Sequence, residues 1–251
     1  MKLLILSAFL CVAVLPAQTP PFFHGETMEY DISWRIFGAG KARLSVAQDS
    51  NISPPVWRAT VSANSTGIVS KLYKVEDVFR SVFTAENYCS EHLQKVLHEG
   101  SRYRDIRIDF DGKRRVAAIR EMDLAHNRLV REAQNPIPAC TFDVVSALYY
   151  VRTLKLETGK TFQVPVNDGG HTILIDVEVQ GKEEIKTPAG VFQTIRVEPQ
   201  VFGGTLFKRS GRMQLWLTDD ASHRLVQVRA KLFIGAISAV LTKFSIAGQA
   251  Q

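Results

Sequence analysis

The sequence predicts a mainly β protein: a large curved antiparallel sheet, shaped as a half-open barrel or clamshell, with one principal helix near residues 143–156. Three observations predict this class. Segments with alternating apolar and polar residues recur along the chain, turn signals separate them about every eight to twelve residues, and only one segment repeats apolar residues at convincing helical spacing. The pattern therefore does not fit a βαβ protein.

Residues 1–17 are expected to form a signal peptide that is cleaved. Lys2 supplies a positive n-region, residues 3–14 are apolar apart from Ser7, and Ala17 is a small residue at a suitable cleavage point. A permanent membrane helix needs about 20 apolar residues, more than this run or any later one supplies. We therefore expect residues 18–251 to form a single β-rich domain, periplasmic or secreted, without a transmembrane span.

Composition and charge exclude one class of binding partner. The chain is 45% hydrophobic and 22% charged, with a formal net charge of +6. Its basic residues are interleaved with acidic ones, as in the segment Arg102–Asp109. Nucleic-acid binding needs a concentrated basic stripe, so we expect no nucleic-acid partner.

Two cysteines, Cys89 and Cys140, remain after cleavage. An oxidising envelope readily joins a single pair, and a closed loop of about 50 residues would stabilise the fold by roughly 4 kcal/mol. Two buried free thiols are the alternative, because no spacing rule applies to one pair. Neither cysteine lies in a Cys-x-x-Cys motif, which leaves redox catalysis unsupported.

Period-two alternation predicts the strands of the N-terminal half. They are residues 29–36, 41–46, 57–64, 77–84, 92–98, 102–110 and 113–121. Phe37–Gly40 is expected to turn the chain between the first two strands, and Asp111-Gly112 to form a two-residue turn between the last two. Thr66–Glu76 loses the alternation and is predicted to be a short helix or an ordered loop.

The principal helix follows the break at Asn135–Pro138, where a weak domain boundary, near residues 135–140, is the alternative to a single domain. Asp143 is a suitable N-cap, and Gly159 is a suitable stop after the helix. One apolar stripe, which needs a sheet to cover, consists of Val144, Ala147, Leu148, Val151 and Leu154. Ser146, Arg152 and Lys155 are expected on the polar side.

Strands resume after the helix. They are predicted at residues 161–166, 171–179, 183–186, 191–199, 212–218, 225–232 and 237–246. Asp219-Asp220 resembles an acid pair for glycoside chemistry. It lies between two strands, however, where Asp favours turns and adjacent side chains of a strand point to opposite faces, so we interpret it as a turn.

No catalytic constellation stands out in the sequence. The six histidines are scattered, none in a His-x-x-x-His pair beside an acid, and there is no Gly-x-Ser-x-Gly elbow. We therefore expect no catalytic residue, no metal site and no cofactor.

Several motifs together resemble the bacterial exported family known as domain of unknown function 3108. They are Gly25-Glu-x-x-x-Tyr30 with Trp34 and the Gly38/Gly40 turn, Asp143–Arg152 leading to Gly159, Thr187–Phe192, Gly211 with Trp216–Asp220, and Gly235-Ala-Ile. The resemblance implies a β-rich envelope protein with no established activity. The architecture also looks like the half-open barrels of periplasmic lipoprotein carriers, a likeness of pattern alone.

These observations favour a non-catalytic envelope protein that binds an apolar or amphipathic ligand, a lipid or a lipoprotein acyl chain, inside the curved sheet. The side chains expected at the cavity are Trp34, Phe37, Tyr73, Phe202, Phe207 and Trp216. A module that binds another envelope protein or a polysaccharide is the alternative. A cell-envelope hydrolase is a third, disfavoured because no nucleophile–base pair is visible.

Overall fold

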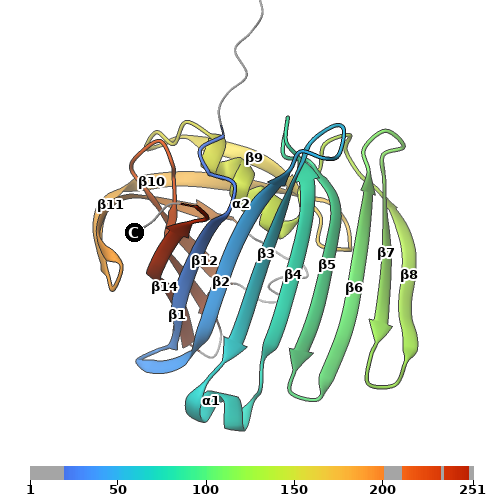
Figure 1. The fold of residues 1–251 in the computed structure, drawn as a ribbon, viewed down its shortest axis with the longest axis horizontal. Coiled ribbons are helices and arrows are strands. Elements are labelled where there is room, and N and C mark those ends of the chain that lie inside the picture. Colours follow the sequence, from blue (N-terminus) through green and yellow to red (C-terminus); the bar gives the residue numbers. More distant parts are fainter. Residues whose placement is uncertain (1–19, 201–210, 233–234, 249–251) are drawn as a thin grey trace, which may run out of the picture.

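Fourteen strands form one antiparallel sheet that is curved but not closed (Figure 1). The computed structural model describes residues 20–200, 211–232 and 235–248, so the predicted signal peptide lies outside the described residues. The predicted fold class, a curved sheet with a helix, is confirmed. No helix in the described part of the chain is long and apolar enough to span a membrane.

The sheet has two arms that meet at its centre. The first arm comprises β1 (Glu26–Trp34), β2 (Phe37–Asp49), β3 (Val56–Ser65), β4 (Glu76–Thr84), β5 (Ser90–Glu99), β6 (Arg102–Asp111), β7 (Val116–Asp123) and β8 (Arg128–Pro136). The second comprises β9 (Thr161–Val166), β10 (Ile173–Thr187), β11 (Gly190–Pro199), β12 (Arg212–Thr218), β13 (Leu225–Leu232) and β14 (Gly235–Ile246). β1 pairs with both β2 and β14, and the two edges are β8 and β9.

The principal helix, α2 (Val144–Thr153), lies between the two arms and contacts β3 and β4 on one side and β9 on the other. Around it the inward side chains of both arms form the main hydrophobic core. A second, smaller core covers β5, β6 and β7 and includes Leu93, Ile108 and Ile119. The β9–β10 loop packs against this second core, because a Cβ added at Gly169 would stand 2.5 Å from Ile119 Cδ1.

A short peptide before α2 joins strands from the two arms. Thr141 accepts a backbone hydrogen bond from Ser90 at the start of β5, and Phe142 pairs in parallel with Val166 at the end of β9. Cys89 and Cys140 form a disulfide at the same place, which confirms the bridged alternative. The start of α2 is therefore fixed to both arms.

The β1–β2 turn lies earlier than the sequence predicts. Arg35 adopts a left-handed conformation with a φ of 56°, so the chain reverses at Arg35 and Ile36, and Phe37 already belongs to β2. Ile36, expected to face the core, is 88% exposed. The alternation in the sequence continues two residues past the end of β1, because nothing local marks a non-glycine residue that takes a positive φ.

The β6–β7 turn is also longer than the two residues expected. β6 ends at Asp111 and β7 begins at Val116, while Arg115 takes the positive φ and the Asp111 carboxylate accepts a hydrogen bond from Arg114 N. Gly112 is needed for packing and not, as predicted, for a two-residue turn. A Cβ there would lie 2.2 Å from the carbonyl oxygen of Ala139, so close packing requires the glycine.

Three further differences concern element bounds. The sequence does not predict β8, because it is an edge strand in which no residue is buried and apolar residues do not alternate with polar ones. The segments predicted at 171–179 and 183–186 form one strand, β10, with a bulge between Val179 and Gly181. The helix ends at Thr153, six residues before Gly159, and Thr66–Glu76 contains the short helix α1 (Gly67–Leu72).

Candidate functional site: an apolar cavity beside helix α2

The N-terminus of α2 is held by a buried carboxylate. Asp143 Oδ1 accepts hydrogen bonds from the backbone N of Val145 and Ser146, and Oδ2 accepts from the hydroxyls of Ser81 and Ser90 at 2.6 and 2.7 Å. Burial raises the pKa of Asp143, and these four hydrogen bonds oppose that shift. The predicted N-cap is therefore confirmed, and it also ties α2 to β4 and β5.

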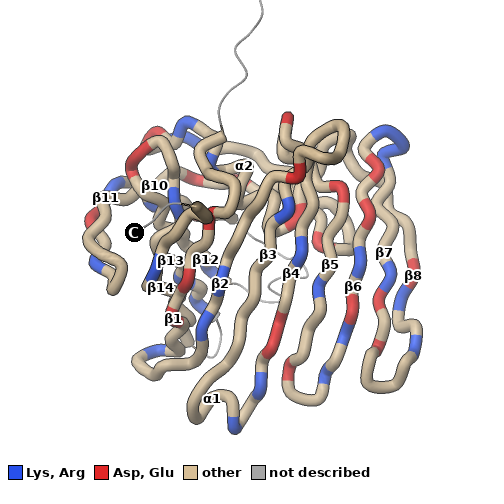
Figure 2. Tube along the Cα trace, viewed as in Figure 1, with Lys and Arg blue, Asp and Glu red and all other residues tan. Residues whose placement is uncertain are grey.

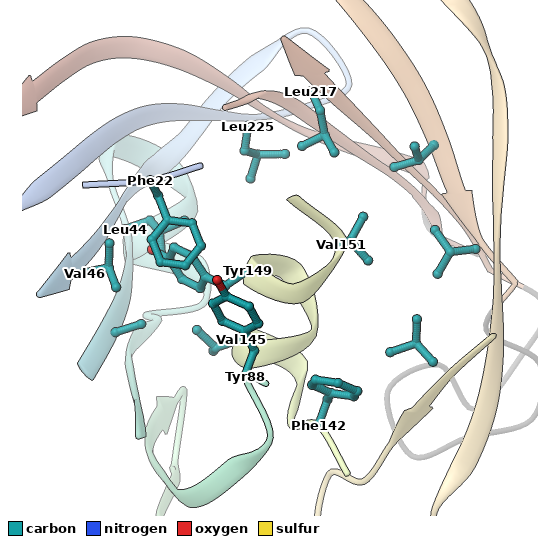
Figure 3. Close-up of a cluster of buried hydrophobic side chains, with 14 of the residues drawn as sticks. Phe22, Leu44, Val46, Tyr88, Phe142, Val145, Tyr149, Val151, Leu217 and Leu225 are labelled. Carbon is teal, nitrogen blue, oxygen red and sulfur yellow. The ribbon is translucent and has the colours of Figure 1, made fainter. Parts of the chain in front are cut away.

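One face of α2 packs tightly against the first arm. Tyr149 lies among Phe22 and Phe83, with ring centroids 4.8 and 5.5 Å away, and Val145 is buried beside them (Figure 3). Aromatic pairs at these separations add to the stabilisation from buried area. This side of the helix is filled core.

Of the polar side expected for the helix, Lys155 is exposed as predicted, but the other two residues are not. Arg152 and Ser146 are both fully buried. The Arg152 guanidinium binds both carboxylate oxygens of Glu26, at 2.6 and 3.1 Å, and donates to the carbonyl oxygen of Ser222. Because β1 and the β12–β13 turn supply these acceptors, a residue expected in solvent instead joins α2 to both arms.

The other face of α2 borders a cavity of about 110 Å³. Its lining consists entirely of apolar residues from α2 and the inward face of the second arm, namely Val144, Ala147, Leu148, Val151, Val164, Val166, Ile175, Val177, Pro199, Met213 and Leu215. In Figure 3, Val151 points away from the aromatic cluster of Tyr149 and Phe22, toward strands of the second arm. The two faces of the helix thus have different surroundings.

The cavity can bind an aliphatic group by exclusion of water. Several lining side chains, including Ala147, Leu148 and Leu215, are only partly buried, so the hollow is open to solvent. Apolar burial contributes about 0.8 kcal/mol for each methylene group. An engineered apolar cavity of about 150 Å³ binds benzene, so a hollow of this size suits a short length of hydrocarbon chain.

Polar groups that could do chemistry lie elsewhere. Within residues 20–200, 211–232 and 235–248, no three His, Cys, Asp or Glu side chains gather in a way that could hold a metal ion. Asp220 shapes the β12–β13 turn, where its carboxylate accepts hydrogen bonds from Ser222 N and from the Thr218 hydroxyl. The prediction of a turn at Asp219-Asp220 is therefore confirmed.

The predicted cavity residues occupy other places. Trp34 ends β1, and Phe37 and Tyr73 are 61% and 53% exposed. Trp216 is buried in β12, between the lining residue Leu215 and Leu217. None of these four lines the cavity, and Phe202 and Phe207 lie outside the described residues.

Part of the cavity lining follows a pattern that the sequence shows. Val144, Ala147, Leu148 and Val151 belong to the apolar stripe of the predicted helix. The sequence indicates that this stripe needs a sheet to cover it, but it predicts large aromatic residues at the cavity wall instead. Whether a face of the helix is filled or hollow depends on where the strands of both arms lie in space, which no local pattern in the sequence shows.

The fold and this cavity define a class: an open, curved antiparallel β-sheet with an apolar hollow between its inner face and a central helix. The chain belongs to the DUF3108 family, described as a protein of unknown function, whose model matches residues 29–242. The resemblance seen in the sequence motifs is thereby confirmed. No protein with a curated description matches the sequence.

Comparison with solved structures finds similarity at low sequence identity. A β-barrel-like protein of the DUF1849 group from Brucella abortus has a TM-score of 0.58 and 9% identity, over 88% of this chain and 97% of that one. A candidate lipoprotein from Parabacteroides distasonis gives a TM-score of 0.39 and 11% identity, over 89% and 96%. A candidate exported protein with a YmcC-like fold from Bacteroides fragilis gives 0.37 and 9%, over 90% and 97%. At 9% identity, the likeness to the Brucella abortus protein concerns the fold alone.

Proposed function

We propose that this protein is a non-catalytic envelope protein that holds the hydrocarbon part of an apolar or amphipathic ligand, a lipid or a lipoprotein acyl chain. The observation that carries the proposal is the cavity beside α2, whose lining contains no polar residue. A hydrocarbon chain gains from leaving water, whereas a polar substrate would lose hydrogen bonds there.

An extracytoplasmic site of action is part of the proposal. The leader at residues 1–17 has the charge, apolar run and small residue of a signal peptide. The disulfide between Cys89 and Cys140 is a bond that persists in oxidising compartments and is rare in the cytosol. Both features support export to the place where envelope lipids and lipoproteins occur.

The anchoring of α2 supports binding rather than core packing alone. The helix is fixed by the Asp143 hydrogen bonds at its start and by the Glu26–Arg152 pair at its end. Because these contacts hold the helix in place, the face of α2 that lines the cavity need not collapse onto the second arm. A cavity whose walls are fixed in this way costs less reorganisation when a ligand enters.

The test is a titration of the mature protein with N-phenyl-1-naphthylamine, an uncharged apolar fluorophore, followed by displacement with palmitate. Ala147→Phe places a ring in the cavity from α2 and is expected to weaken probe binding by about tenfold or more, a change of about 1.4 kcal/mol. Ala221→Phe makes the same substitution at an exposed position of the β12–β13 turn and is expected to leave binding unchanged.

Thermal unfolding of each variant checks that the fold survives. Native mass spectrometry of protein purified from its own envelope adds an independent measurement, in which a retained lipid supports the proposal. Equal probe affinity for the wild type and Ala147→Phe, with both folded, would exclude this cavity as the binding site. Absence of both probe binding and retained lipid would exclude the proposed function.

A further inference from the structure

Four large apolar side chains are exposed at one end of the sheet. Ile36 and Phe37, in and after the β1–β2 turn, are 88% and 61% exposed, and Ile68 and Leu72 of α1 are 76% and 81% exposed. We call these four residues the apolar tips. Single exposed hydrophobic residues are common on proteins, but a group of them at one place marks an interaction site.

Backbone pairing brings the two segments together. Gly40 of β2 pairs with Ser65 of β3, and Thr66 N, directly before α1, donates a hydrogen bond to the carbonyl oxygen of Ala39 at 2.9 Å. The start of β2 and the start of α1 are therefore neighbours. Figure 1 shows the β1–β2 turn and α1 projecting from the same end of the sheet.

The helix α1 lies on the surface, where another molecule can contact it. None of its six residues is buried. A free helix of that length is unstable in water, so hydrogen bonds between its flanking residues and the rest of the protein hold it, among them Thr66 N to Ala39 O and Gly100 N to Lys74 O. Its two large apolar side chains contribute nothing to the core, although exposing them to water is unfavourable.

Positive charge accompanies the apolar tips. Arg35 lies in the β1–β2 turn and Lys71 in the last turn of α1, and Figure 2 shows basic segments at both places. The acidic residues nearby are already neutralised, since Glu76 pairs with Lys74 and Glu99 pairs with Arg102. No acidic side chain of the described residues forms an ion pair with Lys71.

A basic groove continues from the same turn. It holds about 420 Å³ and is lined by Arg35, Arg212, Gln214, Arg229, Lys231, Gly235 and Ala236. Arg212 and Lys231 stand directly opposite each other on β12 and β13, a like-charge pair that is unfavourable in a sheet. Glu198 neutralises Arg212, but among the described residues no carboxylate pairs with Arg229 or Lys231.

We infer that this end of the protein docks on an anionic lipid membrane, with the apolar tips in the hydrocarbon boundary and lipid phosphate groups in the basic groove. Charge complementarity favours this occupant over a protein. The apolar side chains project from turns beside Arg35 and Lys71, for which the described residues provide no ion pair. This order of apolar and basic groups matches an anionic bilayer, in which the phosphates lie outside the acyl chains. The inference concerns a surface separate from the apolar cavity and does not depend on ligand binding there.

Vesicle co-flotation of the mature protein tests the inference. The vesicles are phosphatidylethanolamine with phosphatidylglycerol, compared with phosphatidylcholine alone. We expect flotation with the anionic vesicles at low salt, little with phosphatidylcholine, and a marked loss as salt increases. The double variant Ile36→Ser/Leu72→Ser and the double variant Arg229→Gln/Lys231→Gln should each bind the anionic vesicles about tenfold more weakly.

Matched controls change the same kinds of residue elsewhere. Leu174→Ser/Val191→Ser removes two exposed apolar side chains of the second arm, and Lys113→Gln/Lys186→Gln removes two exposed charges. Both controls should bind as the wild type does. No flotation of the wild type with anionic vesicles, or equal losses in test and control variants, would overturn the inference. So would loss of flotation only when a copurifying protein is removed, which would assign the surface to a protein partner.

Discussion

At the scale of single residues, the buried pair of Glu26 and Arg152 governs how the helix is held. Both side chains are fully buried, and their atoms come from β1 and from the last turn of α2. Two charges removed from water are costly unless each is matched, and here the guanidinium also donates to Ser222 O and lies over the ring of Phe22. The pair stabilises the fold only as a unit.

Removal of both partners should therefore cost less than the sum of the two single removals. Arg152→Met is expected to lower the free energy of unfolding by about 3–5 kcal/mol, because Glu26 would remain buried without a partner. Glu26→Gln/Arg152→Met should lose less than the sum of the two single changes. Urea denaturation of the three variants measures this coupling. Additive losses would show that the two side chains act independently.

The exposed carboxylate of Glu157 gives a prediction about acid stability. Lys155 and Lys160 lower the pKa of Glu157 from its ordinary 4.5 to about 2. A depressed acid pKa stabilises the folded state above pH 4.5, and this contribution is lost as the pH falls through about 2. Compared with Glu157→Gln, the wild type should melt at a higher temperature at neutral pH.

That difference in melting temperature should shrink between pH 4.5 and about 2, the window set by the shifted pKa. Thermal scans of both proteins across this range measure it. Because the group is exposed, the effect should be small and should weaken with added salt. A difference that stays constant across the range would contradict the assigned cause.

At the scale of elements, β2 shows how close packing selects residues that alternation does not. Two glycines lie near its start, and both were expected in a turn. A Cβ at Gly40 would stand 2.3 Å from the carbonyl oxygen of Asn64 on β3, whereas a Cβ at Gly38 would meet nothing within 4 Å. Close packing therefore requires glycine at position 40 but not at position 38.

This contrast predicts different results for one substitution. Gly40→Ala should destabilise the protein by about 1–3 kcal/mol, because β2 and β3 would have to separate. Gly38→Ala should be neutral or stabilise it by up to about 1 kcal/mol, since alanine has less freedom in the unfolded chain. Chemical denaturation of both variants gives the comparison. A loss at position 38 as large as that at position 40 would contradict the packing argument.

At the scale of the whole molecule, polar contacts add to the shared core in linking the two arms across the open side of the sheet. Lys95 of β5 reaches the β9–β10 loop, where its ammonium lies 2.5 Å from Asp168 Oδ1 and donates to the Asp168 carbonyl oxygen. Both side chains are almost fully buried. Together with the disulfide and the Thr141 and Phe142 pairings, this contact sets how far the arms stand apart.

Asp168→Asn should loosen this link. The change leaves a buried ammonium without its counter-charge, so we expect a loss of about 3 kcal/mol and faster amide hydrogen exchange in residues 167–172. Asp219→Asn, which breaks an exposed pair with Lys182, should cost less than about 1 kcal/mol. Unchanged exchange in the loop of Asp168→Asn would show that the arms are held by other contacts.

The sequence by itself determined the class of fold, most of the strands, the N-cap of the helix and its apolar stripe. These features are local: alternation, turn residues and helical spacing follow from which neighbours a side chain meets within a few positions. The same dependence on local sequence explains which features the sequence does not predict. The left-handed Arg35 and the edge strand β8 carry no local signature, so the β1–β2 turn was placed too late and β8 was not seen.

Only the tertiary structure decided the rest. The pairing of β1 with β14 brings the first and last strands together at the centre of the sheet, and it places Glu26 where Arg152 can reach it. The same arrangement leaves a hollow beside the predicted apolar stripe of α2 and buries the face that carries Ser146 and Arg152. Whether an apolar face is covered or left open depends on the distance between elements far apart in the chain, and residue type alone does not encode that distance.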